Sequence, residues 1–297
     1  MQSLADALAE RVVVLDGGLA TELESRGFDL SSGLWSARLL ADDPDAIRAA
    51  HRAYFTAGAE VATAASYQAS LEGFAARGLD GAEMLRRSVE LARQARDDHG
   101  AGWVAASVGP YGAVLADGSE YRGDYGLTVE ALRRFHRPRL SALADAGADV
   151  LAVETIPCLI EVEALVAELT ALDVPAWLSL TISGDRTRAG EPLAQAFAMA
   201  GECPAVIGVG VNCTAPADVP DAVALAARTS GKPAVAYPNS GEGWDATARD
   251  WSGRGGLAAS DVDLWIDRGA RLVGGCCRVG PPDIAAIASQ VERRIER

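Results

Sequence analysis

Hydrophobic residues along the chain gather in eight short apolar or β-branched runs, separated by longer amphipathic stretches. Each run has the length and composition of a buried strand: Arg11–Leu15, Glu60–Ala65, Trp103–Val108, Asp149–Val153, Ala176–Thr181, Val206–Val211, Ala234–Tyr237 and Arg271–Val273. Stretches of helical length lie between them: Pro44–Ala57, Ala82–His99, Thr128–Ala146, Ile160–Ala171, Pro216–Thr229, Ala258–Arg268 and Pro282–Arg294. The pattern predicts a strand followed by a helix, repeated eight times.

Residues at the ends of these stretches support the boundaries. Asp43 before Pro44 offers an N-cap followed by a first-turn proline. Three stretches end in an Ala-Gly-Ala or Arg-Gly-Ala phrase just before a strand, which places Gly58, Gly147 and Gly269 where a left-handed C-cap is favoured. We therefore expect helices to end at these glycines.

The chain has 297 residues and shows neither a Pro/Ser-rich linker nor a change of composition midway. This length suits one α/β barrel or two ordinary domains. The unbroken alternation favours an α/β fold of a single (β/α)8 TIM barrel over residues 1–297, rather than two doubly wound domains.

Composition and charge narrow the classes of partner. Hydrophobic residues make up 49% of the chain and charged residues 23%, which is a globular composition. The net charge of −14 gives no electrostatic reason to bind nucleic acid or an anionic membrane surface. No apolar run approaches the ~18 residues of a membrane span, and the first residues lack a signal-peptide pattern. We expect a cytoplasmic protein that acts on small molecules.

Active sites of such barrels lie at the carboxyl ends of the strands. Here those ends carry two acids, three cysteines and several glycines, in the segments Asp16–Gly18, Ser66–Gln68, Gly109–Gly112, Glu154–Thr155, Ser183–Glu191, Asn212–Cys213, Pro238–Glu242 and Gly274–Cys277. We expect these segments to converge at one mouth.

The cysteines give the most informative part of this set. Cys213 ends the sixth run, and Cys276 and Cys277 end the eighth, so the barrel would bring three thiols to one rim, two strands apart. Three thiolates suit zinc and leave a fourth position open, as in catalytic sites. We expect Gly274 and Gly275 to let the backbone bend so that both neighbouring thiols reach one ion.

The alternative is that these cysteines are small buried hydrophobes, one member of the pair facing each way. The other two, Cys158 and Cys203, stand beside prolines and are interpreted as structural. The three histidines fall in predicted helices away from the strand ends, where we expect helix-surface positions: His51, His99 and His136.

Charge arithmetic indicates what such a zinc would do. Zn²⁺ with three thiolates sums to −1 and is a poor Lewis acid for hydrolysis, whereas three neutral histidines would leave the full +2. A thiolate-rich zinc can still bind a substrate thiol as its anion and keep the sulfur nucleophilic. The predicted chemistry is alkylation of a thiol.

With these residues in view, the chain resembles the homocysteine S-methyltransferases almost end to end. The phrases that carry the resemblance are LDGGLATELE (15–24), GLWSARLL (33–40), TAASYQAS (63–70), GPYGAVLADGSEYRGDYG (109–126), ETIP (154–157), GVNC (210–213), YPNSGEGWD (237–245) and GGCC (274–277). The resemblance implies a barrel in which Cys213, Cys276 and Cys277 ligate zinc and homocysteine sulfur takes the fourth position.

The resemblance also implies that Asp16 and Glu154 lie near the ammonium group of homocysteine, with the amides around Gly17 and Gly18 available to its carboxylate. Anionic acceptors for a buried ammonium fit this arrangement. From the residues alone, Asp16 could instead be a turn residue and Glu154 the partner of an arginine.

For the methyl donor, the barrel uses essentially all of the length, which leaves no room for folate or cobalamin modules. We expect direct transfer from a small donor, and the phrases look like the S-methylmethionine-using branch, with S-adenosylmethionine as a further candidate. Aromatic faces and acids would hold a cationic donor. The aromatic candidates are Tyr67, Tyr111, Tyr125 and Trp244, the acids Asp124 and Glu242, and the remaining substrate-binding candidates Asn212 and Asn239.

Three alternatives stay open. The chain could be a betaine- or selenium-related thiol methyltransferase of the same fold. It could be a homocysteine- and zinc-binding subunit that needs a partner to deliver the methyl group. It could also be a metal-free barrel lyase with buried cysteines.

Overall fold

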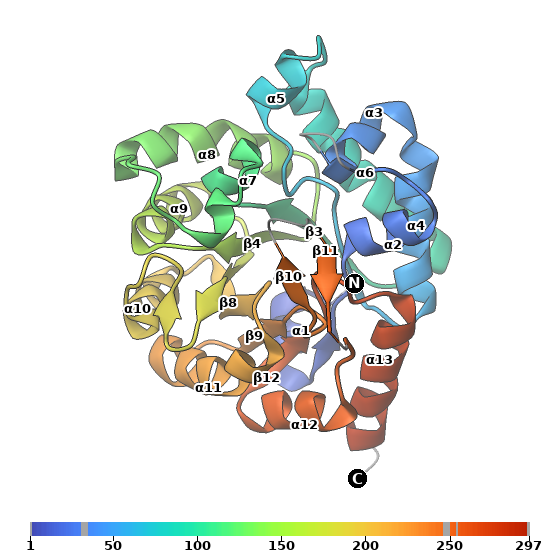
Figure 1. The fold of residues 1–297 in the computed structure, drawn as a ribbon, viewed down its shortest axis with the longest axis vertical. Coiled ribbons are helices and arrows are strands. Elements are labelled where there is room, and N and C mark those ends of the chain that lie inside the picture. Colours follow the sequence, from blue (N-terminus) through green and yellow to red (C-terminus); the bar gives the residue numbers. More distant parts are fainter. Residues whose placement is uncertain (1, 31–34, 246–249, 254, 296–297) are drawn as a thin grey trace.

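The computed structural model describes residues 2–30, 35–245, 250–253 and 255–295. Eight parallel strands form one sheet in the order β1-β12-β9-β8-β5-β4-β3-β2. A bridge between Leu15 and Val61 joins the two edges, so the sheet closes into a barrel (Figure 1). The strands are β1 Val13–Val14, β2 Val61–Thr63, β3 Trp103–Val108, β4 Val150–Ile156, β5 Ala176–Leu180, β8 Val206–Asn212, β9 Ala234–Tyr237 and β12 Ala270–Val273. The predicted single (β/α)8 fold is confirmed.

Helices surround the barrel, and the seven predicted ones are confirmed within a few residues (Figure 1). They are α4 Pro44–Thr56, α6 Gly81–His99, α8 Val129–Ala144, α9 Leu159–Leu172, α11 Val219–Ser230, α12 Ala259–Asp267 and α13 Pro281–Ile295. The predicted stretch Pro216–Thr229 begins as the 3₁₀ turn η3 Pro216–Asp218 and continues as α11. The sequence pattern did not predict the other helical segments: α1 Leu4–Glu10, α2 Leu19–Ser25, α3 Leu39–Asp42, α5 Leu71–Ala75, α7 Tyr111–Leu115, α10 Leu193–Glu202 and the 3₁₀ turns η1 Trp35–Arg38 and η2 Ser119–Tyr121.

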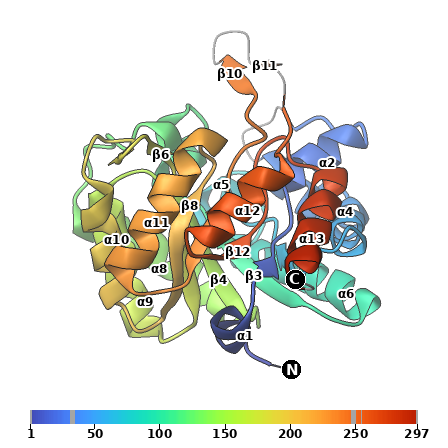
Figure 2. The ribbon, with the colours of Figure 1, turned by 90° about the horizontal axis from the view of Figure 1, so that it is seen from below.

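Two short antiparallel hairpins extend from the strand ends. One pairs β6 (Ile182–Ser183) with β7 (Arg186–Thr187), and the other pairs β10 (Gly243–Asp245) with β11 (Asp250–Ser252). The second projects from the end of the barrel opposite to α1 (Figure 2). The hairpins therefore lie over the carboxyl ends of the strands.

The predicted helix ends follow from the expected capping chemistry. The Asp43 carboxylate accepts a hydrogen bond from the Ala46 amide at 3.1 Å, as an N-cap should. Gly58, Gly147 and Gly269 have φ of +99°, +77° and +110°, a backbone conformation that favours glycine. The capping predictions are confirmed.

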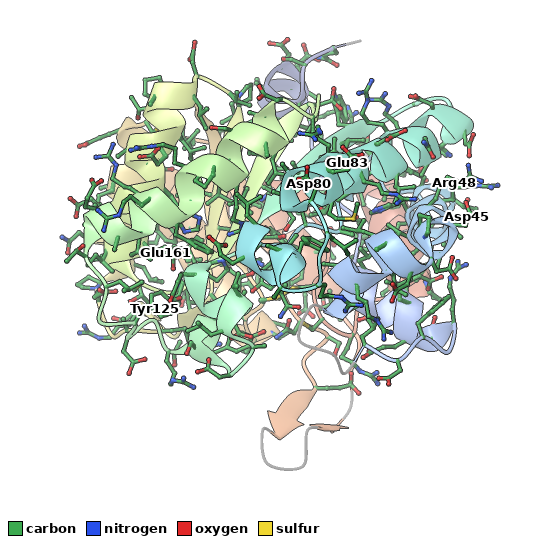
Figure 3. The ribbon with its side chains drawn as sticks, turned by 90° about the horizontal axis from the view of Figure 1, so that it is seen from above. Asp45, Arg48, Asp80, Glu83, Tyr125 and Glu161 are labelled. Carbon is green, nitrogen blue, oxygen red and sulfur yellow. A yellow bond between two sulfur atoms is a disulfide. The ribbon has the colours of Figure 1, made fainter. Side chains whose placement is uncertain are left out.

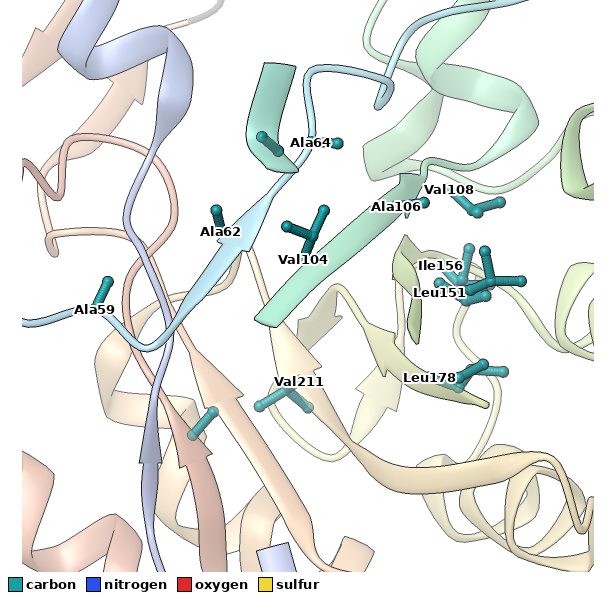
Figure 4. Packing of buried hydrophobic residues seen from close by; sticks show 14 of the residues in the cluster. Ala59, Ala62, Ala64, Val104, Ala106, Val108, Leu151, Ile156, Leu178 and Val211 are labelled. Atoms are coloured by element: carbon teal, nitrogen blue, oxygen red, sulfur yellow. The ribbon is translucent and has the colours of Figure 1, made fainter. Parts of the chain in front are cut away.

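Two hydrophobic layers hold the barrel. Outward side chains such as Ala62, Val104 and Leu178 pack between the strands and the helices (Figure 4). Inward side chains of all eight strands fill the interior, among them Trp103 and Trp177. The apolar face of α1, including Leu8, joins this inner layer and covers the amino end of the barrel. Chemistry is thereby directed to the carboxyl end.

Two sequence expectations about position are corrected. Strand β4 continues to Ile156, so Glu154 and Thr155 lie within the strand rather than after it. His51 and His136 are fully buried, so the expectation of helix-surface positions is wrong for both, and only His99 is exposed. The core accommodates His136 because its Nε2 is hydrogen-bonded to the Glu161 carboxylate on α9 at 2.8 Å. Within the described part of the chain, no helix is long and apolar enough to cross a membrane.

Candidate metal centre and substrate pocket

Three cysteine sulfurs meet at the carboxyl end of the barrel, as predicted. Cys213 follows β8, Cys276 and Cys277 follow β12, and β9 runs between those strands. The three Sγ atoms lie within 4.8 Å of one another. A disulfide joins Cys213 to Cys276, and the Cys277 Sγ lies 3.9 Å from that of Cys213. In the reduced form this group could hold one metal ion, and an all-sulfur donor set suits a soft or borderline cation.

The end of β9 aligns the cysteine pair. The Cys276 amide donates to the Pro238 carbonyl at 2.7 Å, and the Cys277 amide donates to the Asn239 side chain at 3.2 Å. The Cys213 amide donates to the Tyr237 carbonyl at 3.3 Å while Cys213 itself takes the left-handed conformation, with φ of +46°. Neighbouring strands thus hold the sulfurs together, and Asn239 lies where it orients a cysteine.

Glycines allow the β1 loop to press against the cysteine loop. A Cβ on Gly17 would lie 2.2 Å from the Val279 carbonyl oxygen, and one on Gly18 would lie 2.6 Å from that of Cys276. A Cβ on Gly274 would lie 2.6 Å from the Leu15 side chain. A Cβ on Gly275 would lie 2.1 Å from the Val279 side chain, so both glycines permit close packing; neither has a positive φ, and their role in bending the chain stays a prediction.

Burial sets the ionisation of the cluster. It raises the pKa of the Cys277 thiol to about 11, so in the absence of a cation this thiol stays protonated near neutrality. A bound cation favours the thiolate and reverses this effect. The donor set therefore fits a metal that compensates for burial.

The two predicted acids lie beside this cluster in the mouth of the barrel, both buried. Asp16 accepts the Thr63 amide at 2.6 Å and the Thr63 hydroxyl at 2.8 Å, so it spans β1 and β2 instead of capping its own turn. Glu154 accepts from the hydroxyls of Ser107 and Tyr237, the latter at 3.0 Å. Hydroxyl groups, rather than an arginine, hold Glu154 among the described residues.

Both acids have strongly shifted acidity. Burial, with a smaller contribution from the Glu154 carboxylate and against the opposing Thr63 hydrogen bonds, raises the pKa of Asp16 to about 7. Burial likewise raises the pKa of Glu154 to about 7. Two carboxyl groups at this acidity can ionise when a cation arrives, which suits an ammonium group.

A hydrogen-bond network fixes Glu154 from below. The Tyr237 hydroxyl also bonds the Ser179 hydroxyl at 2.7 Å and receives the Trp177 indole N–H at 3.0 Å. Asn212 is fully buried. Its side-chain oxygen accepts a hydrogen bond from the Thr155 amide at 2.7 Å, which holds Thr155 at φ of +62°. Asn212 thus braces β4 next to the acid.

In the turn after β1, the Gly17 and Gly18 amides differ in whether they already form a hydrogen bond. The Gly18 N–H donates to the Val279 carbonyl at 3.0 Å, and the Tyr54 hydroxyl donates to the Gly18 carbonyl at 2.8 Å. Among the described residues, the Gly17 amide makes no hydrogen bond. Only Gly17 of this pair therefore keeps a donor for a ligand.

The aromatic candidates lie in different surroundings. Tyr67 is half-buried and its ring packs against Gly109. Tyr111 packs edge-on against Tyr125 and Phe135, with ring centroids 5.3 and 5.0 Å away. Tyr125 lies toward Glu161, on the side of the molecule opposite to Asp45 and Arg48 (Figure 3). The Trp244 side chain lies outside the described residues.

The acidic candidates for the donor are both paired. Asp124 is exposed and lies 3.7 Å from the Arg122 guanidinium. Glu242 accepts from Ser240 at 2.9 Å and from Arg278 at 3.0 Å.

Sequence reasoning missed three residues of this mouth. Besides burial, the Cys277 thiol lies near enough to Tyr121 to raise its pKa, and the Arg188 guanidinium lies 5.7 Å from the Tyr121 ring centroid. Glu120, next to Tyr121, is buried. The signal was their position in long segments after β3 and β5, although side-chain direction in such loops depends on packing that the sequence does not display.

The fold is a (β/α)8 barrel that carries, at the carboxyl end, a three-cysteine cluster able to hold a metal ion, and comparison with known proteins specifies the family. The family model described as Homocysteine S-methyltransferase matches residues 13–291. The chain is 47% identical to Homocysteine S-methyltransferase of Escherichia coli, covering 94% of this chain and 95% of that protein. It is 40% identical to Selenocysteine methyltransferase of Astragalus bisulcatus, covering 94% and 92%.

Solved structures agree with this. The metallated form of the Escherichia coli homocysteine methyltransferase MmuM superposes with a TM-score of 0.85 at 44% identity, covering 95% of this chain and 96% of that one. The oxidised form of MmuM also gives 0.85, at 45% identity with 94% and 96% covered. The chain belongs to the homocysteine S-methyltransferase family.

Proposed function

We propose that this enzyme transfers a methyl group from a sulfonium donor, S-methylmethionine or S-adenosylmethionine, to the thiol of homocysteine, with zinc held by Cys213, Cys276 and Cys277. The observation that carries the proposal is the meeting of three sulfurs within 4.8 Å beside two buried carboxyl groups. Zinc, when bound, would supply positive charge that lets a thiol ionise at neutral pH.

The residues of the chain have separate tasks in this reaction. Asp16 and Glu154 accept hydrogen bonds from the homocysteine ammonium, and the Gly17 amide donates to its carboxylate. Tyr237 and Ser107 keep Glu154 in place through their hydroxyls. The transfer needs no general base once the thiol is ionised, because the donor leaves as a neutral thioether. The sulfur and methyl carbon should approach to ~3–3.5 Å in line.

The donor panel tests this proposal. Reduced protein is incubated with homocysteine and, separately, S-methylmethionine, S-adenosylmethionine or betaine. Methionine is measured by mass spectrometry, and metals are quantified in the same sample. We expect methionine to form from homocysteine with a sulfonium donor but not with betaine, and the protein to contain about one zinc per chain. Turnover only with betaine, or only after a second protein is added, would reject the proposal.

Selenium chemistry is a second candidate, favoured by the similarity to a selenocysteine methyltransferase. A selenol is a soft nucleophile that suits the same site. Replacing homocysteine by selenocysteine as acceptor, with the donor unchanged, distinguishes the two acceptors by their kcat/KM ratio.

A further inference from the structure

One buried acid at the carboxyl end of the barrel has a carboxylate oxygen without a hydrogen-bond partner among the described residues. Glu120 in η2 is 5% exposed, and its Oε2 has no hydrogen-bond partner among the described residues. A buried acceptor without a donor costs about 1–3 kcal/mol, and more when it is charged. Burial accordingly raises the pKa of Glu120. A cationic N–H donor from a ligand would remove this cost.

The local packing fixes Glu120 at this place. A Cβ on Gly112 of α7 would lie 2.4 Å from the Glu120 amide nitrogen, so only glycine lets the two turns approach this closely. Among the described residues no ion pair joins Arg122 to Glu120: Arg122 bonds the Ser119 hydroxyl at 2.8 Å and lies 3.7 Å from Asp124, and its charge lowers the pKa of Glu120 without offsetting burial.

Glu120 lies in the segment after β3, at the carboxyl end of the barrel where the cysteine cluster lies. Burial is the main cause that raises the pKa of Tyr67, Tyr121 and Cys277, and the Glu120 carboxylate adds to the rise in all three. Tyr121, the next residue along the chain, lies near enough to Cys277 for that thiol to raise its pKa. The unpartnered carboxylate therefore lies on the same side of the barrel as the cysteine cluster.

A cation lies close to the same tyrosine. Arg188 follows β7, with its guanidinium 5.7 Å from the Tyr121 ring centroid. Its Nε donates to the Thr181 hydroxyl at 3.2 Å, and that hydroxyl donates to the Cys213 carbonyl at 3.0 Å. Arg188 forms no ion pair within the described part of the chain, so its planar N–H groups can take a carboxylate.

We propose that Glu120 and Arg188, which both adjoin Tyr121, form a subsite for the α-amino-acid head of the methyl donor: Glu120 accepts from its ammonium and Arg188 binds its carboxylate. This rests on the proposed function, in that the donor is a sulfonium. It makes the donor an α-amino acid, held apart from the homocysteine head at Asp16 and Glu154.

The subsite predicts a particular kinetic signature. The donor head does not change during transfer, so its contacts are equal in the ground state and the transition state. Losing such contacts raises KM and leaves kcat nearly unchanged. For a donor without an ammonium group, KM should not depend on Glu120, because such a donor offers no N–H to Oε2.

The experiment compares Glu120→Gln and Arg188→Gln with two donors, S-methylmethionine and dimethylsulfoniopropionate, which has the carboxylate but no ammonium. Glu120→Gln should raise the KM for S-methylmethionine roughly tenfold, the effect of losing one charged hydrogen bond, and leave that for dimethylsulfoniopropionate unchanged. Arg188→Gln should raise the KM for both donors, because both carry a carboxylate. The homocysteine KM should change less than about twofold in either variant.

Glu130→Gln and Arg186→Gln, exposed residues of the same types, serve as controls. Equal effects of Glu120→Gln on the two donors, or an unchanged KM for S-methylmethionine, would overturn the subsite. Calorimetric binding of S-methylmethionine separates the two proposals. If the wild-type protein transfers no methyl group but binds S-methylmethionine more tightly than the Glu120→Gln variant does, the proposed function fails and the subsite stands. If the wild-type protein neither reacts with it nor binds it, the subsite fails too.

Discussion

Replacing Asp16 by asparagine should stabilise the protein, relative to wild type, at mildly alkaline pH and not at mildly acidic pH. Burial raises the pKa of Asp16 from 3.8 to about 7, so the folded protein holds this proton to higher pH than the unfolded chain does. A carboxyl group of this kind makes folding less favourable as pH rises from about 4 to about 7, because the unfolded state then ionises while the folded state resists. Asparagine has no such proton.

The size of the effect follows from these two pKa values. Between about pH 5 and about pH 8 the wild type should lose about 3 kcal/mol of unfolding free energy that Asp16→Asn keeps. The variant also loses one of the two acceptors used by Thr63, a cost of about 1–3 kcal/mol at every pH. The difference between variant and wild type is therefore expected to move by about 3 kcal/mol in favour of the variant over this pH interval.

Urea denaturation followed by circular dichroism measures this difference. Chelator-treated protein is used at both pH values, so that metal binding adds no pH dependence of its own. Asp185→Asn, a substitution of the same kind at a side chain that is 91% exposed, should stay within about 0.5 kcal/mol of wild type throughout. A variant-minus-wild-type difference in unfolding free energy that is equal at the two pH values would refute the reasoning.

In turnover assays, Asp16→Asn should raise the KM for homocysteine far more than that for the donor.

Three further substitutions test the site. Cys213→Ser should lower bound zinc from about one per chain to near zero by elemental analysis, whereas Cys203→Ser, a buried free cysteine away from the cluster, should keep it; equal zinc in both would contradict the ligand assignment. Tyr237→Phe removes one hydrogen bond to Glu154, and steady-state kinetics should show a homocysteine KM roughly fivefold higher with similar kcat; a lower kcat at constant KM would argue against a binding role. Gly17→Ala should destabilise by at least about 2 kcal/mol in thermal unfolding because its Cβ meets a backbone oxygen at 2.2 Å, while Gly280→Ala, whose Cβ would meet only ordinary contacts, should cost much less.

The barrel was predictable because its signals are local. Eight buried strands, their helices and the glycine caps are each written within about twenty residues of sequence, and β/α alternation then leaves few topologies. Helix α10 was missed although its buried residues Leu193, Ala196, Phe197 and Ala200 recur at helical spacing, because its sequence, LAQAFAMAGE, has only Gln195 and Glu202 as polar side chains to mark the opposite face.

The convergence of Cys213, Cys276 and Cys277 also followed from the fold, since strand ends meet at one rim. Other features depended on partners far along the chain. The buried His136 bonds Glu161 on the neighbouring helix, and among the described residues Oε2 of Glu120 has no hydrogen-bond partner while Arg122 bonds Ser119. Such choices are made by packing between elements, which no periodicity displays.

Helix α1, whose apolar face closes the amino end of the barrel, also bears on the order of events in catalysis. With that end covered, both reactants use the mouth at the carboxyl end. The residues assigned to the thiol acceptor, Asp16 and Glu154, belong to the strands and their immediate ends, whereas Glu120 and Arg188 lie on loops above them. A donor seated on those loops would obstruct the acceptor behind it. We expect a compulsory order in which homocysteine enters first and its methylated product leaves last.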